Sequence, residues 1–301
     1  MRNLKKRTAL IIFLCLVLVM AILPMQVFAT DVTNEVLTSG DWKYILEDGN
    51  ATITGYIGSD TTLNIPSTIE SYTVTKIRET SLSGLKNVVE IVIPDTITEI
   101  GYDVFSGNTS LKTLTVPDSV TKIGGEFCNS CTSLETVKLP ANLEAIEYHT
   151  FAGCVNLKEI TIPSTVTSIG YYAFNNCKAL KTLTIPESVT TLGEGAFASC
   201  TGLTEVTIPA ETTSIDASSF SNCTNTKFNV YYNSTAHAWT KTQGYSYELI
   251  DMPTTTITDT ESKISIVLAA ESTAEMKVDP IEESTDVYKE LLEKLTNATP
   301  I

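Results

Sequence analysis

Apolar side chains recur at a fixed interval of 23 residues through the middle of the chain. The segments 157–180 and 180–203 have nearly the same sequence, and in both of them Leu and Ile alternate with Thr just before a proline. This alternation predicts a short strand with one buried face and one solvent-facing face. A period that recurs over many copies predicts a solenoid in which each copy forms one tier.

Three residue types mark this period. The prolines are Pro66, Pro94, Pro117, Pro140, Pro163, Pro186 and Pro209. The cysteines are Cys131, Cys154, Cys177, Cys200 and Cys223. The phenylalanines are Phe105, Phe127, Phe151, Phe174, Phe197 and Phe220. Stacked tiers are expected to bury these rings and thiols with the Leu and Ile of the strands in one column, so that each tier is stabilised by its neighbours.

A solenoid needs a cap over each open end, and the sequence before the repeats predicts one. Residues 30–65 contain two apolar stretches, 42–46 and 51–57, on either side of Asp48-Gly49. Two alternating stretches around such a turn predict a β-hairpin. The repeats themselves are expected over 66–227.

The sequence after the repeats predicts a C-terminal cap over 228–251. Residues 234–243 are expected to form a short helix, with Asn233 or Ser234 as its N-cap and Gly244 as its end. Residues 245–250 are expected to form a strand.

The two ends of the chain lie outside this pattern. Residues 1–29 combine a basic start, an apolar run and small residues before the end of the segment, which predicts a secretory signal peptide. Residues 252–301 are interpreted as an acidic linker and tail, or as the start of a further domain. Within this segment a Thr-rich linker is expected over 253–263. Two strands are expected at 264–268 and 274–278, and a helix at 286–295.

The repeat L-x-x-[IL]-x-[IVL]-P-x-x-V-x-x-[IL]-G-x-x-[AS]-F-x-x-C-x-x-L is clearest in residues 111–117, 157–177 and 180–200. It resembles the repeat of the BspA-like leucine-rich repeat family. The resemblance implies a mainly β, right-handed leucine-rich-repeat solenoid of about seven tiers. It also implies a secreted or surface protein, chiefly of host-associated bacteria, in a family of which some members are adhesins for host matrix glycoproteins or epithelial surfaces.

Charge narrows the class of partner. Removing residues 1–29 takes away four of the 20 Lys and Arg residues and none of the 35 Asp and Glu residues, so the net charge changes from −15 to −19. Such a surface repels nucleic acid and anionic lipid. The expected partner is an extracellular protein or glycoprotein, with no nucleic acid and no transmembrane span in the mature chain. The mature chain is expected to be a monomer.

The periodic cysteines do not predict a metal site, because metal ligands must converge on one point and these residues lie one tier apart. Asn108 takes the same place one tier before Cys131, since either side chain can bond to the backbone of a neighbouring turn. Parallel side-chain directions disfavour disulfides, so free and buried thiols are expected. Cys128 and Cys131 form a C-x-x-C motif, for which the alternatives are a structural pair, which we favour, and a redox site.

No motif for catalysis or for a cofactor occurs in the sequence. The two histidines are expected on the surface of a tier, for His149, and on the cap helix, for His237. Neither belongs to H-E-x-x-H, and there is no G-x-S-x-G and no phosphate-binding loop. The prediction is a protein that is not an enzyme, without catalytic, cofactor-binding or metal-binding residues.

The outward positions of the predicted strands form the candidate partner-binding face, since solenoids commonly bind through such a surface. Lysines directly before several strands add to it. The candidate residues are Glu90, Lys112, Thr113, Thr115, Thr136, Lys138, Lys158, Glu159, Thr161, Lys181, Thr182, Thr184, Glu205 and Thr207. Thr also favours strands for its own sake, and Lys–Glu pairs between tiers reduce repulsion, so a purely structural surface is the alternative.

These observations predict a secreted or cell-surface binding protein that recognises a protein or glycoprotein, as in adhesion. The alternative is a structural or targeting module of a larger secreted multidomain protein. A glycan-active enzyme is a third alternative, for which the sequence holds no site signature.

The first testable prediction concerns export. The basic start and the apolar run predict cleavage after Ala29, so N-terminal sequencing of secreted protein should begin near Thr30. Replacing the apolar residues Leu14 and Leu16 by Arg should stop secretion, because the apolar run is what the export machinery recognises. An uncleaved product that stays in the cytoplasm would contradict the prediction.

Overall fold

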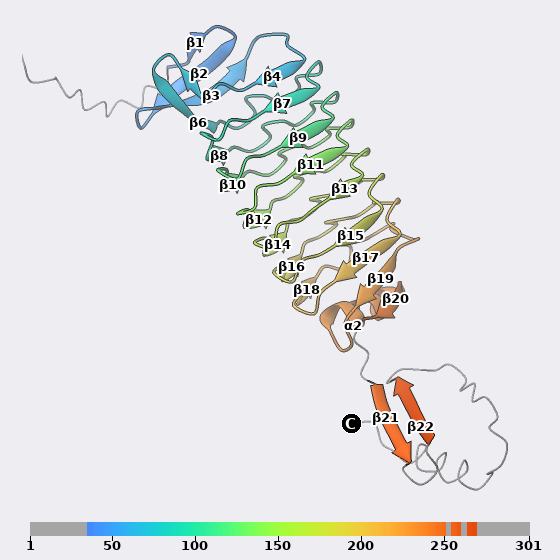
Figure 1. The fold of residues 1–301 in the computed structure, drawn as a ribbon. Coiled ribbons are helices and arrows are strands. Elements are labelled where there is room, and N and C mark those ends of the chain that lie inside the picture. The colour runs from blue at the N-terminus through green and yellow to red at the C-terminus, as the bar shows by residue number, and fades with distance from the viewer. Residues whose placement is uncertain (1–34, 251–253, 260–263, 270–301) are drawn as a thin grey trace, which may run out of the picture. The chain divides into compact units, whose positions relative to one another are not determined.

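The computed structural model describes residues 35–250, 254–259 and 264–269. They belong to two compact units, divided between Asp251 and Met252. The first unit is a mainly β solenoid of about nine turns with one short helix (Figure 1), which confirms the predicted fold class. The predicted signal peptide over 1–29 lies outside the described residues.

One side of the solenoid is built from a series of strands that we call the long row. Its members are β4 (Thr62–Asn64), β7 (Glu90–Val92), β9 (Thr113–Thr115), β11 (Thr136–Lys138), β13 (Glu159–Ile160), β15 (Thr182–Thr184), β17 (Glu205–Ile208), β19 (Lys227–Val230) and β20 (Ser246–Leu249). Hydrogen bonds join β4 through β13 in one sheet and β15 through β20 in another. The strands up to β17 are the predicted tiers. Each is short because the proline that follows has no N–H to donate.

A second row of strands runs along another side of the solenoid. Its members are β6 (Tyr72–Ile77), β8 (Glu99–Ile100), β10 (Lys122–Ile123), β12 (Ala145–Ile146), β14 (Ser168–Ile169), β16 (Thr191–Leu192) and β18 (Ser214–Ile215). Glycine follows several of them because the backbone of the preceding tier comes close. A Cβ on Gly124 would lie 2.5 Å from the backbone nitrogen of Tyr102. The glycine in the repeat is therefore a requirement of tier packing.

The third side of each tier consists of turns whose backbone bonds to the next tier. The N–H of Phe105, for example, donates to the carbonyl of Phe127 at 2.9 Å, and that of Cys128 donates to Thr150 at 2.8 Å. Cys128 thus takes the place that Phe105 and Phe151 hold in the tiers on either side. The ring of this tier moves to the preceding position, Phe127, and both side chains are fully buried.

Phenylalanine rings form a continuous column inside the solenoid. Phe174 stacks on Phe151 and on Phe197, with ring centroids 5.4 and 5.0 Å apart. The column continues to Phe220, whose ring lies 5.0 Å from that of Phe197. The side chains of these four residues have no exposed surface. The predicted inward positions are therefore confirmed as core.

Beside the rings, each periodic cysteine is hydrogen bonded to the preceding tier. The thiols of Cys131, Cys154, Cys177, Cys200 and Cys223 each donate to the carbonyl of the residue 26 positions earlier, at 3.0 to 3.3 Å. Asn108 does the same to Leu82 at 3.1 Å and also accepts from the N–H of Leu85 at 2.6 Å. The predicted exchange of Asn and Cys at this place is confirmed, and the six cysteines of the described chain form no disulfide.

The N-terminal end carries the predicted hairpin, made of β2 (Trp42–Glu47) and β3 (Asn50–Tyr56). Its second strand pairs in parallel with β6, so the hairpin continues the sheet of the second row over the first tier. Two short strands were not predicted. They are β1 (Leu37–Ser39), which pairs with β2, and β5 (Thr68–Ile69), which pairs with β6.

The C-terminal end is closed by helix α2 (Thr235–Gln243), as predicted. Ser234 caps its N-terminus by accepting from the N–H of His237 at 3.1 Å, and Gly244 ends it in the left-handed conformation at φ 74°. The ring of Trp239 on this helix lies 5.7 Å from that of Phe220, so it covers the last ring of the column.

The second unit contains an antiparallel pair, β21 (Thr254–Asp259) and β22 (Ile264–Ala269). The strand predicted at 264–268 is confirmed. The linker predicted over 253–263 is wrong in part, because Thr254–Asp259 forms a strand; Thr and Ile favour strands through their branched side chains. The strand and helix predicted at 274–278 and 286–295 lie outside the described residues.

A second prediction concerns the ring column. Phe174→Ala should lower the free energy of unfolding by about 3–5 kcal/mol, because it removes a buried ring that touches rings in both neighbouring tiers. Urea denaturation measures the change, and Val92→Ala is the control, since Val92 is 44% exposed. Equal stability of Phe174→Ala and the parent would place Phe174 outside the core.

A third prediction concerns the thiols. Burial raises the pKa of Cys154 and Cys177 well above the usual value, and that of Cys223 to about 12. Native protein should resist alkylation at pH 8, and denatured protein should react at all six sites, counted by mass spectrometry. Stability should also fall as pH rises above about 8.5, because the unfolded chain then loses thiol protons that the native state retains.

Cys128 should be as protected as the periodic cysteines, because it is fully buried. Rapid native labelling of Cys128 alone would contradict its place in the column. Disulfides between successive tiers in the native protein would overturn the hydrogen-bonded arrangement of the periodic cysteines.

Candidate functional site

The candidate residues lie together on the outer surface of the long row, which we call the strand face. Thr136 and Thr207 are half-buried and the other twelve are exposed. Between them, Ile91, Leu114 and Leu183 point inward and are at most 4% exposed. The strand pattern therefore assigned inward and outward positions correctly, and it left the outward side chains free of core packing.

Parallel register places the outward side chains in lines across the tiers. Thr113 lies opposite Glu90 on one side and Thr136 on the other, and Thr136 lies opposite Glu159. A second line runs through Thr115 and Lys138. Since adjacent strands are about 4.8 Å apart, a partner that follows such a line meets one side chain from every tier.

Part of the charge on the strand face is paired between tiers. The ammonium of Lys158 lies 2.5 Å from a carboxylate oxygen of Glu135 and lowers the pKa of that carboxyl below its usual value. Near the C-terminal end Lys227 pairs with Glu248, and the amide of Asn229 donates to Glu205 at 2.6 Å. These exposed pairs contribute little to stability, so they remain available to a charged partner.

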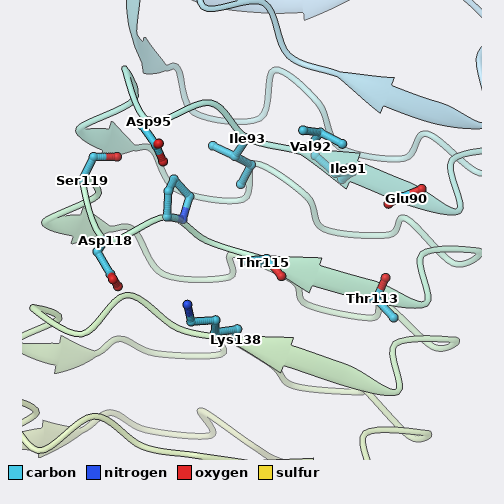
Figure 2. A pocket seen from close by; sticks show the side chains of 11 residues that line it. Glu90, Ile91, Val92, Ile93, Asp95, Thr113, Thr115, Asp118, Ser119 and Lys138 are labelled. Atoms are coloured by element: carbon cyan, nitrogen blue, oxygen red, sulfur yellow. The ribbon is translucent and has the colours of Figure 1, made fainter.

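The strand face is hollowed near its N-terminal end, as Figure 2 shows. The hollow has a volume of about 640 Å³. Its lining residues are Glu90, Ile91, Val92, Ile93, Asp95, Thr113, Thr115, Pro117, Asp118, Ser119 and Lys138. Five of them belong to the predicted face. The others are inward or strand-end residues and the turns that follow Pro94 and Pro117.

The turns after the prolines form one wall of the hollow. Asp118 accepts from the N–H of Ala141 in the next tier at 2.9 Å, and Ser119 donates to the carbonyl of Ile97 in the preceding tier at 2.7 Å. These bonds fix the turn beside the strands. The prediction missed Asp95 and Asp118 because it considered only the strands, although both residues directly follow a proline of the repeat.

The hollow combines chemical groups of several kinds. Asp95 and Asp118 provide carboxylates on one side, and Lys138 provides an ammonium at one end (Figure 2). Lys138 forms no ion pair with any described residue. Val92 is exposed between the polar groups. An apolar patch among hydroxyls and charges of both signs suits a polypeptide or a glycan chain.

The described residues offer no arrangement for redox or metal chemistry. Cys128 and Cys131 are both fully buried, and burial raises the pKa of Cys128 well above its usual value. A buried, protonated thiol is a poor nucleophile, which supports the structural interpretation of the C-x-x-C motif. Among the residues that the structure describes, no three His, Cys, Asp or Glu side chains converge to hold a metal ion.

The prediction for one histidine is corrected by the structure. His149 was expected to be a solvated surface residue, but it is half-buried and stacks on Tyr172, with ring centroids 5.5 Å apart. The ring of Tyr172 is contributed by the next tier, at a spacing of 23 residues. His237 lies on α2 as predicted.

No helix within the described ranges has both the length and the apolar character that a membrane crossing requires.

The repeats match a known sequence profile. The profile of the BspA type leucine rich repeat region matches residues 56–157 and 124–237, with six copies. No curated protein matches the chain.

Solved structures of several bacterial leucine-rich repeat proteins are similar to this chain. The T. pallidum protein TpLRR is 22% identical over 71% of this chain and 98% of its own, with a TM-score of 0.43. A protein from Bacteroides ovatus is 24% identical over 64% and 70%, with a TM-score of 0.36. A protein from Eubacterium ventriosum is 28% identical over 52% and 49%, with a TM-score of 0.39.

Proposed function

The chain belongs to the BspA type leucine-rich repeat family, and from that membership we propose that it is a secreted or cell-surface binding protein. Its ligand is an extracellular protein or glycoprotein, as in adhesion, and the ligand is bound on the strand face. The family is typically extracellular or surface-associated, and the acidic mature chain suits that setting. The chain has no enzymatic activity in this proposal.

The observation that carries the proposal is the hollow on the strand face. Most of this face is regular and nearly flat, and a flat row of Thr hydroxyls gives a partner little to enclose. At the hollow, carboxylates, an unpaired ammonium and an exposed Val92 surround one space. Binding energy concentrates in a few enclosed residues, while the surrounding contacts contribute complementarity. The hollow is therefore the anchor, and the strand face beyond it extends the contact.

Other parts of the solenoid are committed to packing. The Phe column and the thiols fill the interior, the hairpin of β2 and β3 extends over the first tier, and Trp239 covers the last ring. A macromolecular partner cannot reach these groups without unfolding tiers. The strand face has no such commitment, because its residues are exposed and their lines cross many tiers.

A second function is favoured by the second compact unit. The paired strands β21 and β22 give residues after Asp251 a structure of their own. In that case the solenoid serves as a structural or targeting module of a larger secreted multidomain protein. The two functions differ in which unit binds, so the mature chain 30–301 should be compared with residues 30–251.

The fourth prediction tests the strand face. A screen of mature chain against matrix glycoproteins identifies a ligand, and binding is then measured for variants of similar melting temperature. Thr115→Arg, in the hollow, and the pair Thr161→Arg with Thr184→Arg, farther along the face, should each weaken binding about tenfold or more, because a long cation blocks close approach. The matched control is Thr167→Arg with Thr190→Arg, two exposed residues beside the second row.

The charged residues give a further arm of the same test. Lys158→Glu with Lys181→Glu should weaken binding more at low salt than at 0.1 M, where exposed charges are screened within about 10 Å. Equal binding by the strand-face variants and the control would place the site elsewhere. Binding by the full mature chain but not by 30–251 would assign the function to the second unit.

A further inference from the structure

Five aromatic side chains gather at the corner between the second row and the turns. We call this group the aromatic corner. It consists of Tyr102, Tyr148, His149, Tyr171 and Tyr172. Tyr148 and Tyr171 hold the same place in successive tiers, as do His149 and Tyr172, and Tyr102 precedes Tyr148 by two tiers. The group therefore lies on a different side of each tier from the long row.

The rings are ordered in two parallel stacks. Tyr148 and Tyr171 have centroids 5.4 Å apart with planes within 8°, and His149 and Tyr172 have centroids 5.5 Å apart with planes within 11°. The two stacks meet edge to face, since His149 and Tyr171 lie 5.1 Å apart at 85°. Such arrangements are favourable for aromatic rings, and here they fix the surface side chains in position.

The neighbouring sequence makes room for these rings. A Cβ on Gly125 would lie 2.6 Å from the ring of Tyr148, and a Cβ on Gly195 would lie 2.5 Å from that of Tyr172. Each stack therefore ends on a glycine. His149 and Tyr172 also adopt the left-handed conformation, at φ 50° and 52°, which is costly for residues other than glycine. Gly195 occupies the same place, so the fold itself does not require aromatic residues there.

The aromatic corner is outside the core. Tyr171 is 46% exposed and Tyr102 is 41% exposed, whereas the inner ring column is fully buried. Tyr171 stacks on Tyr148 through one face, and no described ring stacks on its other face. At the equivalent place in the next tier stands Glu194. An open aromatic face thus borders a carboxylate about one strand spacing away.

Carboxylates surround the rings, and cations do not. The corner residues of these tiers, 101–103, 124–126, 147–149, 170–172 and 193–195, include Asp103, Glu126, Glu147 and Glu194 but no Lys or Arg. The hydroxyl of Tyr172 donates to Glu194 at 3.0 Å, which holds that carboxylate beside the stacks. Burial, and next the charge of Glu126, raise the pKa of Tyr148. The rings and the carboxylates therefore share one negatively charged surface.

We propose that the aromatic corner is a second binding surface, which receives arginine side chains from a basic segment of a partner protein. A guanidinium is attracted to the face of an aromatic ring, and its planar fork also pairs with a carboxylate. Tyr171 with Glu194 provides both groups side by side. A neutral glycan would use the ring face but would gain nothing from the charge, so the acidic setting favours a cationic polypeptide. This inference does not depend on the strand face.

Fluorescence anisotropy with two labelled peptides tests the inference on the full mature chain. One peptide alternates arginine with serine over ten residues, and the other has citrulline in place of arginine, which keeps the shape and removes the charge. The parent should bind the arginine peptide and not the citrulline peptide. Tyr171→Ala should weaken binding about three- to fivefold, whereas Tyr171→Phe keeps the ring and should bind like the parent.

Charge needs its own control, because any loss of a carboxylate from an acidic protein weakens cation binding. Glu194→Gln should weaken binding of the arginine peptide about threefold, while Glu187→Gln, an exposed carboxylate at the turn after Pro186, should leave it unchanged. Thr115→Arg on the strand face should also leave it unchanged, so failure of the strand-face function is a separate outcome.

Several results would overturn the inference. They are absence of binding, equal binding of the arginine and citrulline peptides, equal losses for Glu194→Gln and Glu187→Gln, and parent-like binding by Tyr171→Ala. Displacement of the arginine peptide by a neutral oligosaccharide at the same site would assign the corner to glycan instead. Melting curves of the variants should match that of the parent, since the stacks lie outside the core.

Discussion

Register between successive tiers is the constraint on which the rest of the structure depends. A tier of 23 residues has too little apolar surface to be stable alone, so its rings and thiols must lie directly on those of the next tier. The periodic thiols enforce this register chemically. The carbonyl of Phe174 is buried, and the thiol of Cys200 in the next tier satisfies it at 3.0 Å. A slip of one residue would leave that carbonyl unpaired and misplace the rings, and both changes are costly.

The tier that contains Phe127 shows which part of the register is essential. Here the ring and the thiol have exchanged places, with Phe127 before Cys128, yet the backbone bonds to Phe105 and Thr150 remain in step. The rings adapt by meeting edge to face, since Phe127 and Phe151 lie at 88° while Phe174 and Phe197 lie at 1°. The backbone ladder thus fixes the positions, and the core fills the space that remains.

The same constraint explains what the sequence predicts and what it does not. Strand positions, the buried thiols and both caps follow from periodicity and from local signals such as Ser234 and Gly244, because these depend on neighbours in sequence. The hollow and the aromatic corner depend on contacts between tiers. Asp118 and Ala141 are 23 residues apart, and so are His149 and Tyr172. Such residues look variable when one repeat is compared with another, and their association is visible only when the outward positions are aligned by tier. The strand at Thr254 lies after the last repeat, where this alignment gives no guidance.

A solenoid of this kind separates stability from recognition. Inward positions must recur because every tier solves the same packing problem, whereas outward positions are limited only by strand preference and charge. Each outward position is repeated along an array about one strand spacing apart, so a substitution in one tier adds one element to an extended surface. On the strand face the array carries hydroxyls and charges of both signs around a hollow. At the aromatic corner it carries rings and carboxylates. One backbone register thus presents two surfaces of different chemistry, and because they lie on different sides of the tiers, a partner on one leaves the other free.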